Sequence, residues 1–278
     1  MTYFNIKQYF FIAGVCLLTS AAQADNSSYL RFESTTDDNN NNDHYLSAGI
    51  ELINKSQLQL SYGRSEASAL TSDNYSVGIV SDPLAEFSAG LSYLYWEQTG
   101  ELETRTYQLS LMTNTTDWSF GISPQLRVIT IYPLTAPAFD INSTGLGLNA
   151  GYYGAYPFFI SSTFQFYSYQ RNVTVLNSTQ YPRFTMRNFS ASALDQNNGL
   201  EDNRFTLNIG YSFSQFTLGY HRERSLSAVN NATYTTNSIY GSFNLTDNWQ
   251  LGAETGQAKD STTTDTVSFK SLSITYNW

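Results

Sequence analysis

The 278-residue chain contains one cysteine and two histidines. Because disulfides need cysteine pairs, a disulfide-stabilised fold is excluded. The lone Cys16 follows Val15, whereas a lipid-modified cysteine normally follows a small residue, so a lipoprotein is disfavoured. No spacing of Cys, His or Asp suggests a metal site, and no glycine-rich loop suggests phosphate binding. We therefore expect no cofactor.

Charged residues are also scarce, at 13% of the chain against about 25% in typical soluble domains. Asp and Glu outnumber Lys and Arg by 23 to 14, which gives a net charge of −9. Nucleic-acid binding needs clustered Lys and Arg, so the acidic balance argues against that function. Aromatic residues are plentiful, with 21 Tyr and 18 Phe, and Asn, Ser and Thr are abundant. This composition suits a wall with one apolar side and one hydrated side.

Long apolar runs are missing as well. After Asp25 no segment has 18 consecutive apolar residues, which excludes a helical membrane span. The first 24 residues have Lys7, an apolar run over 10–18 and the ending Ala22-Gln23-Ala24, which is typical of a secretory signal peptide. We expect cleavage after Ala24 and a single domain over residues 25–278, with a net charge of −10 once Lys7 is removed.

Strict alternation of apolar and polar residues recurs in blocks of about ten residues, bounded by Asn, Asp, Gly, Ser or Pro. The apolar phase is clear in segments such as Leu46, Ala48, Ile50 and Leu52. Twelve or sixteen strands stay open if a weak strand has been merged or split. The pattern predicts fourteen strands, at 28–35, 45–53, 57–65, 74–81, 86–96, 104–113, 117–130, 144–153, 158–170, 204–213, 215–225, 236–245, 248–257 and 267–278.

The connections between these strands alternate in length, with six short turns and seven longer polar links. Aromatic residues such as Trp118 and Trp249 gather beside the short turns, as in the interfacial girdle of membrane barrels. Together these features predict an all-β fold, a transmembrane up-and-down antiparallel β-barrel. We expect both termini to lie on the periplasmic side.

At this point the chain resembles the outer-membrane β-barrel proteins of Gram-negative bacteria, most nearly the monomeric fourteen-stranded porins. The C-terminal row looks like the signal that the barrel assembly machinery reads in this class, although Lys270 departs from the pattern. That row is Leu272, Ile274, Tyr276 and Trp278. The resemblance implies a monomer in the outer membrane, in contact with its lipid and lipopolysaccharide, that passes small hydrophilic solutes.

The alternation also sorts the charged residues into two sets. Fourteen strands should leave a modest pore, and facing Arg and Glu rows would set a transverse field. Tyr29, Trp96, Tyr153, Tyr167, Tyr169 and Tyr240 share the inward phase and either stack on sugar rings or fill the lumen. The charged or titratable residues expected to line the lumen are Arg31, Glu33, Glu51, Arg127, Arg171, Arg204, His221, Glu223 and Glu254.

Four arginines instead fall in or near the outward phase, at the predicted extracellular ends of their strands. They are Arg64, Arg105, Arg222 and Arg224. An arginine costs about 0–1 kcal/mol near the membrane interface against about 2–4 kcal/mol at the midplane. At the interface these side chains either bind lipopolysaccharide phosphates or extend into the headgroups.

Enzyme chemistry has few candidates. His221 shares the inward phase with Glu223, which would give a general base and its orienting group, or only a wall histidine held by Glu223. His44 lies in an acidic segment with Asp37, Asp38 and Asp43, which is either a rim site of protease type or a solvated loop.

The long link 172–203 either folds inward as a constriction or stands above the membrane as a hairpin. Overall the sequence predicts a pore, with oligosaccharides as candidate solutes. The alternatives are a barrel hydrolase of lipase, deacylase or protease type using His221 or His44, and a structural barrel or membrane anchor of a larger assembly.

Overall fold

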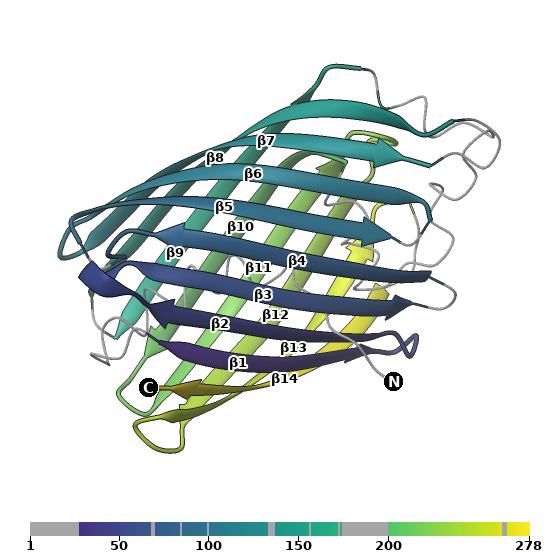
Figure 1. Ribbon diagram of the computed structural model, residues 1–278. Helices are drawn as coiled ribbons and strands as arrows, with labels where there is room; N and C mark the ends of the chain where they lie inside the picture. Colours follow the sequence, from purple (N-terminus) through teal and green to yellow (C-terminus); the bar gives the residue numbers. More distant parts are fainter. Residues whose placement is uncertain are drawn as a thin grey trace.

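The computed structural model describes residues 28–67, 70–83, 85–98, 100–132, 137–155, 157–171, 173, 200–262 and 266–278, which form one closed antiparallel barrel (Figure 1). The predicted signal peptide lies outside these residues. Among the described residues, no helix is long and apolar enough to cross a membrane.

The sequence prediction of fourteen strands is confirmed, and each predicted bound lies within five residues of the observed one. A short 3-10 helix, η1 (Ile53–Lys55), turns the chain between β2 and β3. The strands are β1 (Tyr29–Asp37), β2 (Asn42–Glu51), β3 (Gln57–Ala67), β4 (Leu70–Val80), β5 (Phe87–Gln98), β6 (Leu102–Asn114), β7 (Trp118–Ile131), β8 (Phe139–Ala155), β9 (Phe158–Tyr169), β10 (Glu201–Ser212), β11 (Phe216–Ser227), β12 (Thr233–Asn244), β13 (Trp249–Asp260) and β14 (Thr266–Asn277).

Closure joins the two ends of the chain. Each strand pairs with its neighbours in sequence, and β1 also pairs with β14, with Tyr29 opposite Asn277. The backbone amide of Trp278 donates to the carbonyl oxygen of Ser28 at 3.1 Å. The barrel therefore has no open strand edge at its seam, and β1 begins at the same end of the barrel at which β14 finishes.

The strands extend into the ends of the predicted long polar links. β3 and β4 are joined by residues 68–69 alone, and β1 and β2 by a turn over 38–41 in which Asn40 takes a positive φ of 60°. Ten of the fourteen strands have 12–17 residues, which exceeds the ~9–11 residues needed to cross a bilayer. Polar side chains on both faces are tolerated in the extra length because water solvates them there. Among these links, only the one between β9 and β10 is long.

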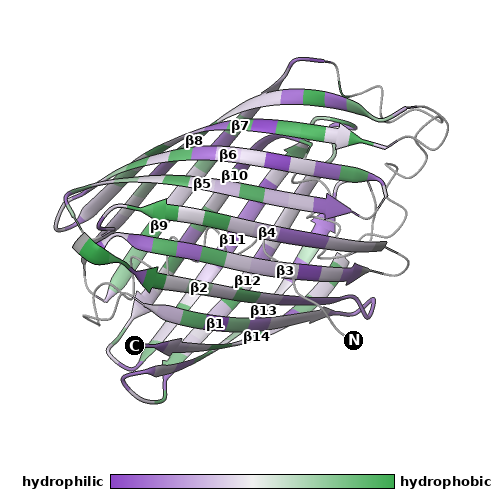
Figure 2. Ribbon diagram, viewed as in Figure 1, coloured by the Kyte–Doolittle hydropathy of each residue, from purple (hydrophilic) through white to green (hydrophobic). Residues whose placement is uncertain are grey.

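The outer face of the barrel is apolar over its middle. Leu91, Leu126, Ile239 and Leu272 are each more than half exposed, and Figure 2 shows hydrophobic and hydrophilic residues alternating along the strands. Near the short turns, outward aromatic rings pack in pairs such as Trp118 with Tyr152 and Trp249 with Tyr276, each with centroids 4.7 Å apart. A hydrocarbon layer would cover this surface, as it does on membrane barrels.

Candidate functional site: the barrel lumen

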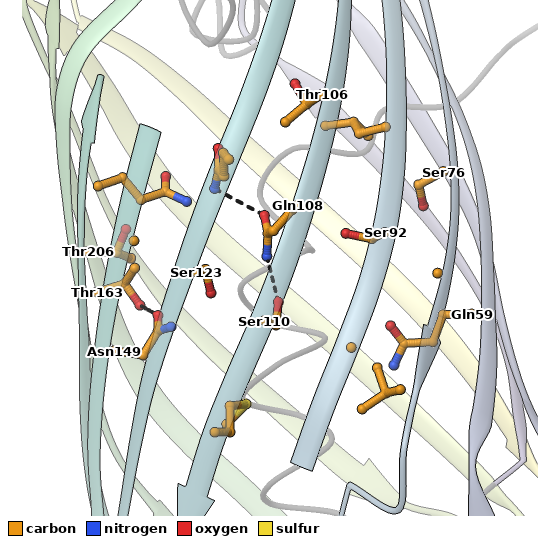
Figure 3. Close-up of a pocket in the computed structure, with 18 of the residues that line it drawn as sticks. Gln59, Ser76, Ser92, Thr106, Gln108, Ser110, Ser123, Asn149, Thr163 and Thr206 are labelled. Carbon is orange, nitrogen blue, oxygen red and sulfur yellow. Dashed lines mark hydrogen bonds between the residues drawn. The ribbon is translucent and has the colours of Figure 1, made fainter. Parts of the chain in front are cut away.

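The inner positions of the strands carry mainly small hydroxyl and amide side chains. A cavity of about 320 Å³ lies between them, lined largely by residues of β3 to β10 (Figure 3). Gln125 donates to Gln108 at 3.0 Å, Gln108 donates to the hydroxyl of Ser110 at 2.9 Å, and Thr163 donates to Asn149 at 2.7 Å. This wall offers neutral donors and acceptors to a polar solute.

Several inward aromatic rings lie over glycines of the barrel wall. Each stands directly opposite a glycine of the neighbouring strand, and a Cβ atom at that glycine would come within less than 3.0 Å of the ring. The glycine therefore provides the space that the ring occupies. These pairs are Tyr29 with Gly49, Tyr167 with Gly145, Tyr240 with Gly219, Phe159 with Gly210 and Phe269 with Gly256.

One group of charges sits on β7, β9, β10 and β11. The guanidinium carbon of Arg127 lies 4.1 Å from the ring centroid of Tyr167. Arg204 donates to the carboxylate of Glu201, and its Nε is 3.7 Å from Glu223. Arg127, Arg204, Tyr167 and Glu223 all line the cavity.

A second group lies at the seam. Arg31 donates to Glu33 at 2.8 Å, and Glu33 also accepts from Ser271 on β14. On β13, Glu254 accepts from Ser238 at 2.5 Å. Asp43 on β2 accepts from Ser65 at 2.7 Å.

Seven of the nine residues predicted to line the lumen lie on the inner face of a strand: Arg31, Glu33, Arg127, Arg204, His221, Glu223 and Glu254. Glu51 ends β2 at the short-turn end and is exposed, and Arg171 follows β9 and is exposed. Four inward acids were missed, namely Asp37, Asp43, Glu201 and Asp260. They lie in strand ends that the sequence pattern assigned to links, so continuing the alternation further would have found them.

His221 is held by a different partner from the one expected. Its Nδ1 lies 2.8 Å from Oδ1 of Asn208, which stands directly opposite on β10. Glu223, two positions along the same strand, lies beside Arg204 instead. The direct cross-strand neighbour is closer than a same-face neighbour two residues away, and this explains why the predicted His221–Glu223 pair is wrong.

His44 does not join its acidic neighbours. Within β2 it points outward, where its ring stacks against Phe32 with centroids 6.5 Å apart, while Asp43 points inward. Asp37 faces inward on β1, and Asp38 accepts the backbone amide of Ser268 at 3.1 Å. The expected rim cluster is therefore split between two faces of the sheet. Within the described ranges no group of three or more metal-ligating side chains occurs.

The four outward arginines fall into two kinds. Arg64 on β3 lies 3.8 Å from Asp73, and Arg105 on β6 is 2.9 Å from Glu103. Arg222 and Arg224 are exposed on β11, and no acid of the described strands forms an ion pair with either.

The two ends of the long link between β9 and β10 are anchored in the barrel. Val173 and Leu200 are buried in an apolar cluster with Trp96, Ile129, Ile141 and other inward residues of β5 to β8. The described ends of the link thus lie against the inner wall. Residues 174–199, on which the choice between a constriction and a hairpin depends, lie outside the described residues.

No protein-family model and no curated protein sequence matches the chain. Solved structures do match. The CymD monoaromatic hydrocarbon channel superposes with a TM-score of 0.58 at 10% identity, covering 100% of this chain and 94% of the channel. The chain has the fold of an outer-membrane β-barrel.

Two further structures show the same barrel fold. The outer membrane protein Omp33 of Acinetobacter baumannii matches with a TM-score of 0.50 at 10% identity, over 91% of this chain and 98% of Omp33. The NanC porin matches with a TM-score of 0.50 at 9% identity, over 90% of this chain and 100% of NanC. At this level of identity the likeness concerns the outer-membrane barrel fold, while function has to be argued from the lumen.

Proposed function

We propose that the protein is a pore of the Gram-negative outer membrane through which small hydrophilic solutes diffuse passively. The observation that carries this proposal is the contrast between the two faces of one closed wall: exposed Leu, Ile, Phe and Trp outside, and Ser, Thr, Gln and Asn around an internal cavity. Two of the matched structures are named as a channel and a porin, which supports this choice.

Oligosaccharides are the proposed solute class. Amide and hydroxyl groups such as Gln108, Gln125 and Thr163 can exchange hydrogen bonds with sugar hydroxyls. Beside them, the guanidinium of Arg127 lies over the ring of Tyr167, and the same ring fills the space next to Gly145. A ring held close to the wall leaves room for a sugar to pass.

The proposed orientation places the end that carries Tyr29 and Trp278 toward the periplasm. The outward row Leu272, Ile274, Tyr276 and Trp278 would be read by the barrel assembly machinery. At the opposite end, lipopolysaccharide phosphates would bind the outward cations of β11, β13 and β14, because Arg222 and Arg224 are joined there by exposed Lys259 and Lys270. Arg64 and Arg105, with carboxylates beside them, are weaker candidates. We propose a monomer.

Conductance through a planar lipid bilayer tests the pore. The purified barrel should give steady steps in current that are proportional to voltage. A silent barrel without hydrolytic activity would instead support a structural barrel or an anchor of a larger assembly.

A hydrolase using His221 is the second candidate, because Asn208, His221 and Ser238 stand side by side on β10, β11 and β12. Asn208 can orient the imidazole, as a catalytic triad requires. However, the hydroxyl of Ser238 donates to Glu254, and none of the three residues lines the cavity. Hydrolysis of phospholipid or peptide that is lost in His221→Ala, together with a silent bilayer, would favour this candidate over the pore.

A further inference from the structure

On the inner face of the described barrel, acidic side chains outnumber basic ones. Three arginines face inward from the strands: Arg31, Arg127 and Arg204. Seven carboxylates face inward with them: Glu33, Asp37, Asp43, Glu201, Glu223, Glu254 and Asp260. The lumen wall of the described strands is therefore strongly anionic.

The outer face of the same strands is close to neutral. Its basic residues are Arg64, Arg105, Arg222, Arg224, Lys259 and Lys270, and its acidic residues are Glu66, Asp73, Glu97, Glu103, Asp140 and the exposed Asp202. The six charges of each sign cancel, and Glu51 is exposed at the end of β2, so most of the net charge of the described strands comes from the lumen.

The inward charges are also unevenly distributed around the barrel. On β7, β10 and β11, Arg127 and Arg204 balance Glu201 and Glu223. The remaining five acids lie on β13, β1 and β2, which together with β14 form four adjacent strands, and Arg31 is the one inward base on these described strands. We name this acidic stretch around the seam, β13-β14-β1-β2, the seam wall.

Three carboxylates of the seam wall are held by hydrogen bonds, whereas Glu33 forms an ion pair with Arg31. Asp43 accepts from the hydroxyl of Ser65, Glu254 from that of Ser238, and Asp260 from the backbone amide of Thr262. These donors are neutral. The Debye length is about 10 Å at 0.1 M salt, so fixed charges on the wall of a narrow lumen act on ions throughout its cross-section. Rings of Asp and Glu select cations in other channels for this reason.

We infer that the pore selects cations, and that it passes cationic and neutral solutes in preference to anionic ones. This inference rests on the proposed pore function. It assigns to the seam wall the role of attracting cations and repelling carboxylated or phosphorylated solutes.

The reversal potential in a planar bilayer under a potassium chloride gradient measures this selectivity directly. The wild-type barrel should give a potassium-to-chloride permeability ratio above one. The triple variant Asp43→Asn, Glu254→Gln and Glu33→Gln should lower that ratio because it removes three negative charges from the seam wall. Each new side chain keeps an oxygen that can accept the existing hydrogen bond, so the wall should stay intact.

A matched control removes three outward acids instead: Asp73→Asn, Glu97→Gln and Glu103→Gln. It changes the total charge by the same amount, so its permeability ratio should stay at the wild-type value. If the seam triple variant does not assemble, Glu254→Gln alone should lower the ratio in the same direction. Liposome swelling should be faster with glucosamine than with glucuronate.

The outcomes separate the two proposals. Current steps with a ratio at or below one in the wild type would overturn the inference and leave the pore standing. An equal loss of selectivity in the outward control would also overturn it, because total charge and not the seam wall would then be responsible. A silent wild-type barrel would overturn the pore itself, and the inference with it.

Discussion

The ring of Tyr167 contacts both the position of Gly145 and the guanidinium of Arg127. A Cβ atom at Gly145 would be 2.8 Å from two carbons of the tyrosine ring, and the guanidinium carbon of Arg127 lies over the same ring, 4.1 Å from its centroid. Three adjacent strands, β7, β8 and β9, thus hold one aromatic ring against the wall of the lumen. Because the ring fills the space of a missing side chain, the residue at position 145 controls how far Tyr167 projects.

We predict that Gly145→Ala pushes the Tyr167 ring into the lumen. Overpacking of this kind typically costs about 1–3 kcal/mol, and the contact with Arg127 would weaken as well. Single-channel conductance and the free energy of unfolding in detergent should both fall.

Gly241→Ala is the control, since the nearest atom to a Cβ there is a backbone oxygen at 3.4 Å, an ordinary contact. Adding Tyr167→Ala to Gly145→Ala should restore the conductance. Failure of that second change to restore it would mean that the ring does not narrow the path.

Neutralising an inward base should act in the opposite direction to neutralising the seam wall. We predict that Arg127→Gln raises the potassium-to-chloride permeability ratio, because it removes one of three inward arginines. The measurement is again the reversal potential. Arg105→Gln, on the outer face of β6, should leave the ratio unchanged, and a shift of similar size in both variants would contradict the prediction.

The outward cations Arg222, Arg224, Lys259 and Lys270 should retain lipopolysaccharide. A Lys or Arg near an anionic lipid surface contributes about 1 kcal/mol. Replacing all four with Gln should therefore strongly reduce the lipopolysaccharide that copurifies with the barrel. Arg64→Gln with Arg105→Gln is the comparison, and we expect a much smaller loss, because Asp73 and Glu103 already lie beside these side chains.

A charge on the lipid-facing side of β14 should affect stability according to its depth. Leu272 is 69% exposed and lies well inside the strand, so Leu272→Lys should destabilise the folded barrel by about 2–4 kcal/mol. Thr266→Lys, on the same face at the end of β14, should cost only about 0–1 kcal/mol. Unfolding by urea in lipid vesicles checks both values, and equal costs would argue against a hydrocarbon layer around Leu272.

The fold could be predicted because its main signal is local. Alternation with period two identified all fourteen strands, and the apolar phase of each strand is the phase that faces outward. The strand ends were harder to predict. Polar residues on both faces of a segment resemble a loop in the sequence, although the backbone pairing of two strands can continue beyond the apolar part of the barrel. That is why Asp43 was expected in a loop and lies in β2.

The side-chain partners could not be predicted because they depend on register. Whether His221 meets Asn208 or Glu223 is decided by the alignment of β10 against β11, which the sequence does not encode in any short motif. The placement of Tyr167 over Gly145 depends in the same way on the alignment of β8 against β9. The lumen was thus predictable as a set of inward residues, but its contacts were not.

The pairing of Leu30 with Tyr276 and of Phe32 with Ile274 unites residues separated by almost the whole chain. Contacts of such long range form late, because a large loop must be ordered before they contribute any favourable energy. Until β14 arrives, β1 and β13 each present unpaired amides and carbonyls that hydrocarbon cannot solvate. The barrel should therefore insert into the membrane only as a closed cylinder. A truncated chain that lacks β14 should fail to insert and should be degraded by proteases.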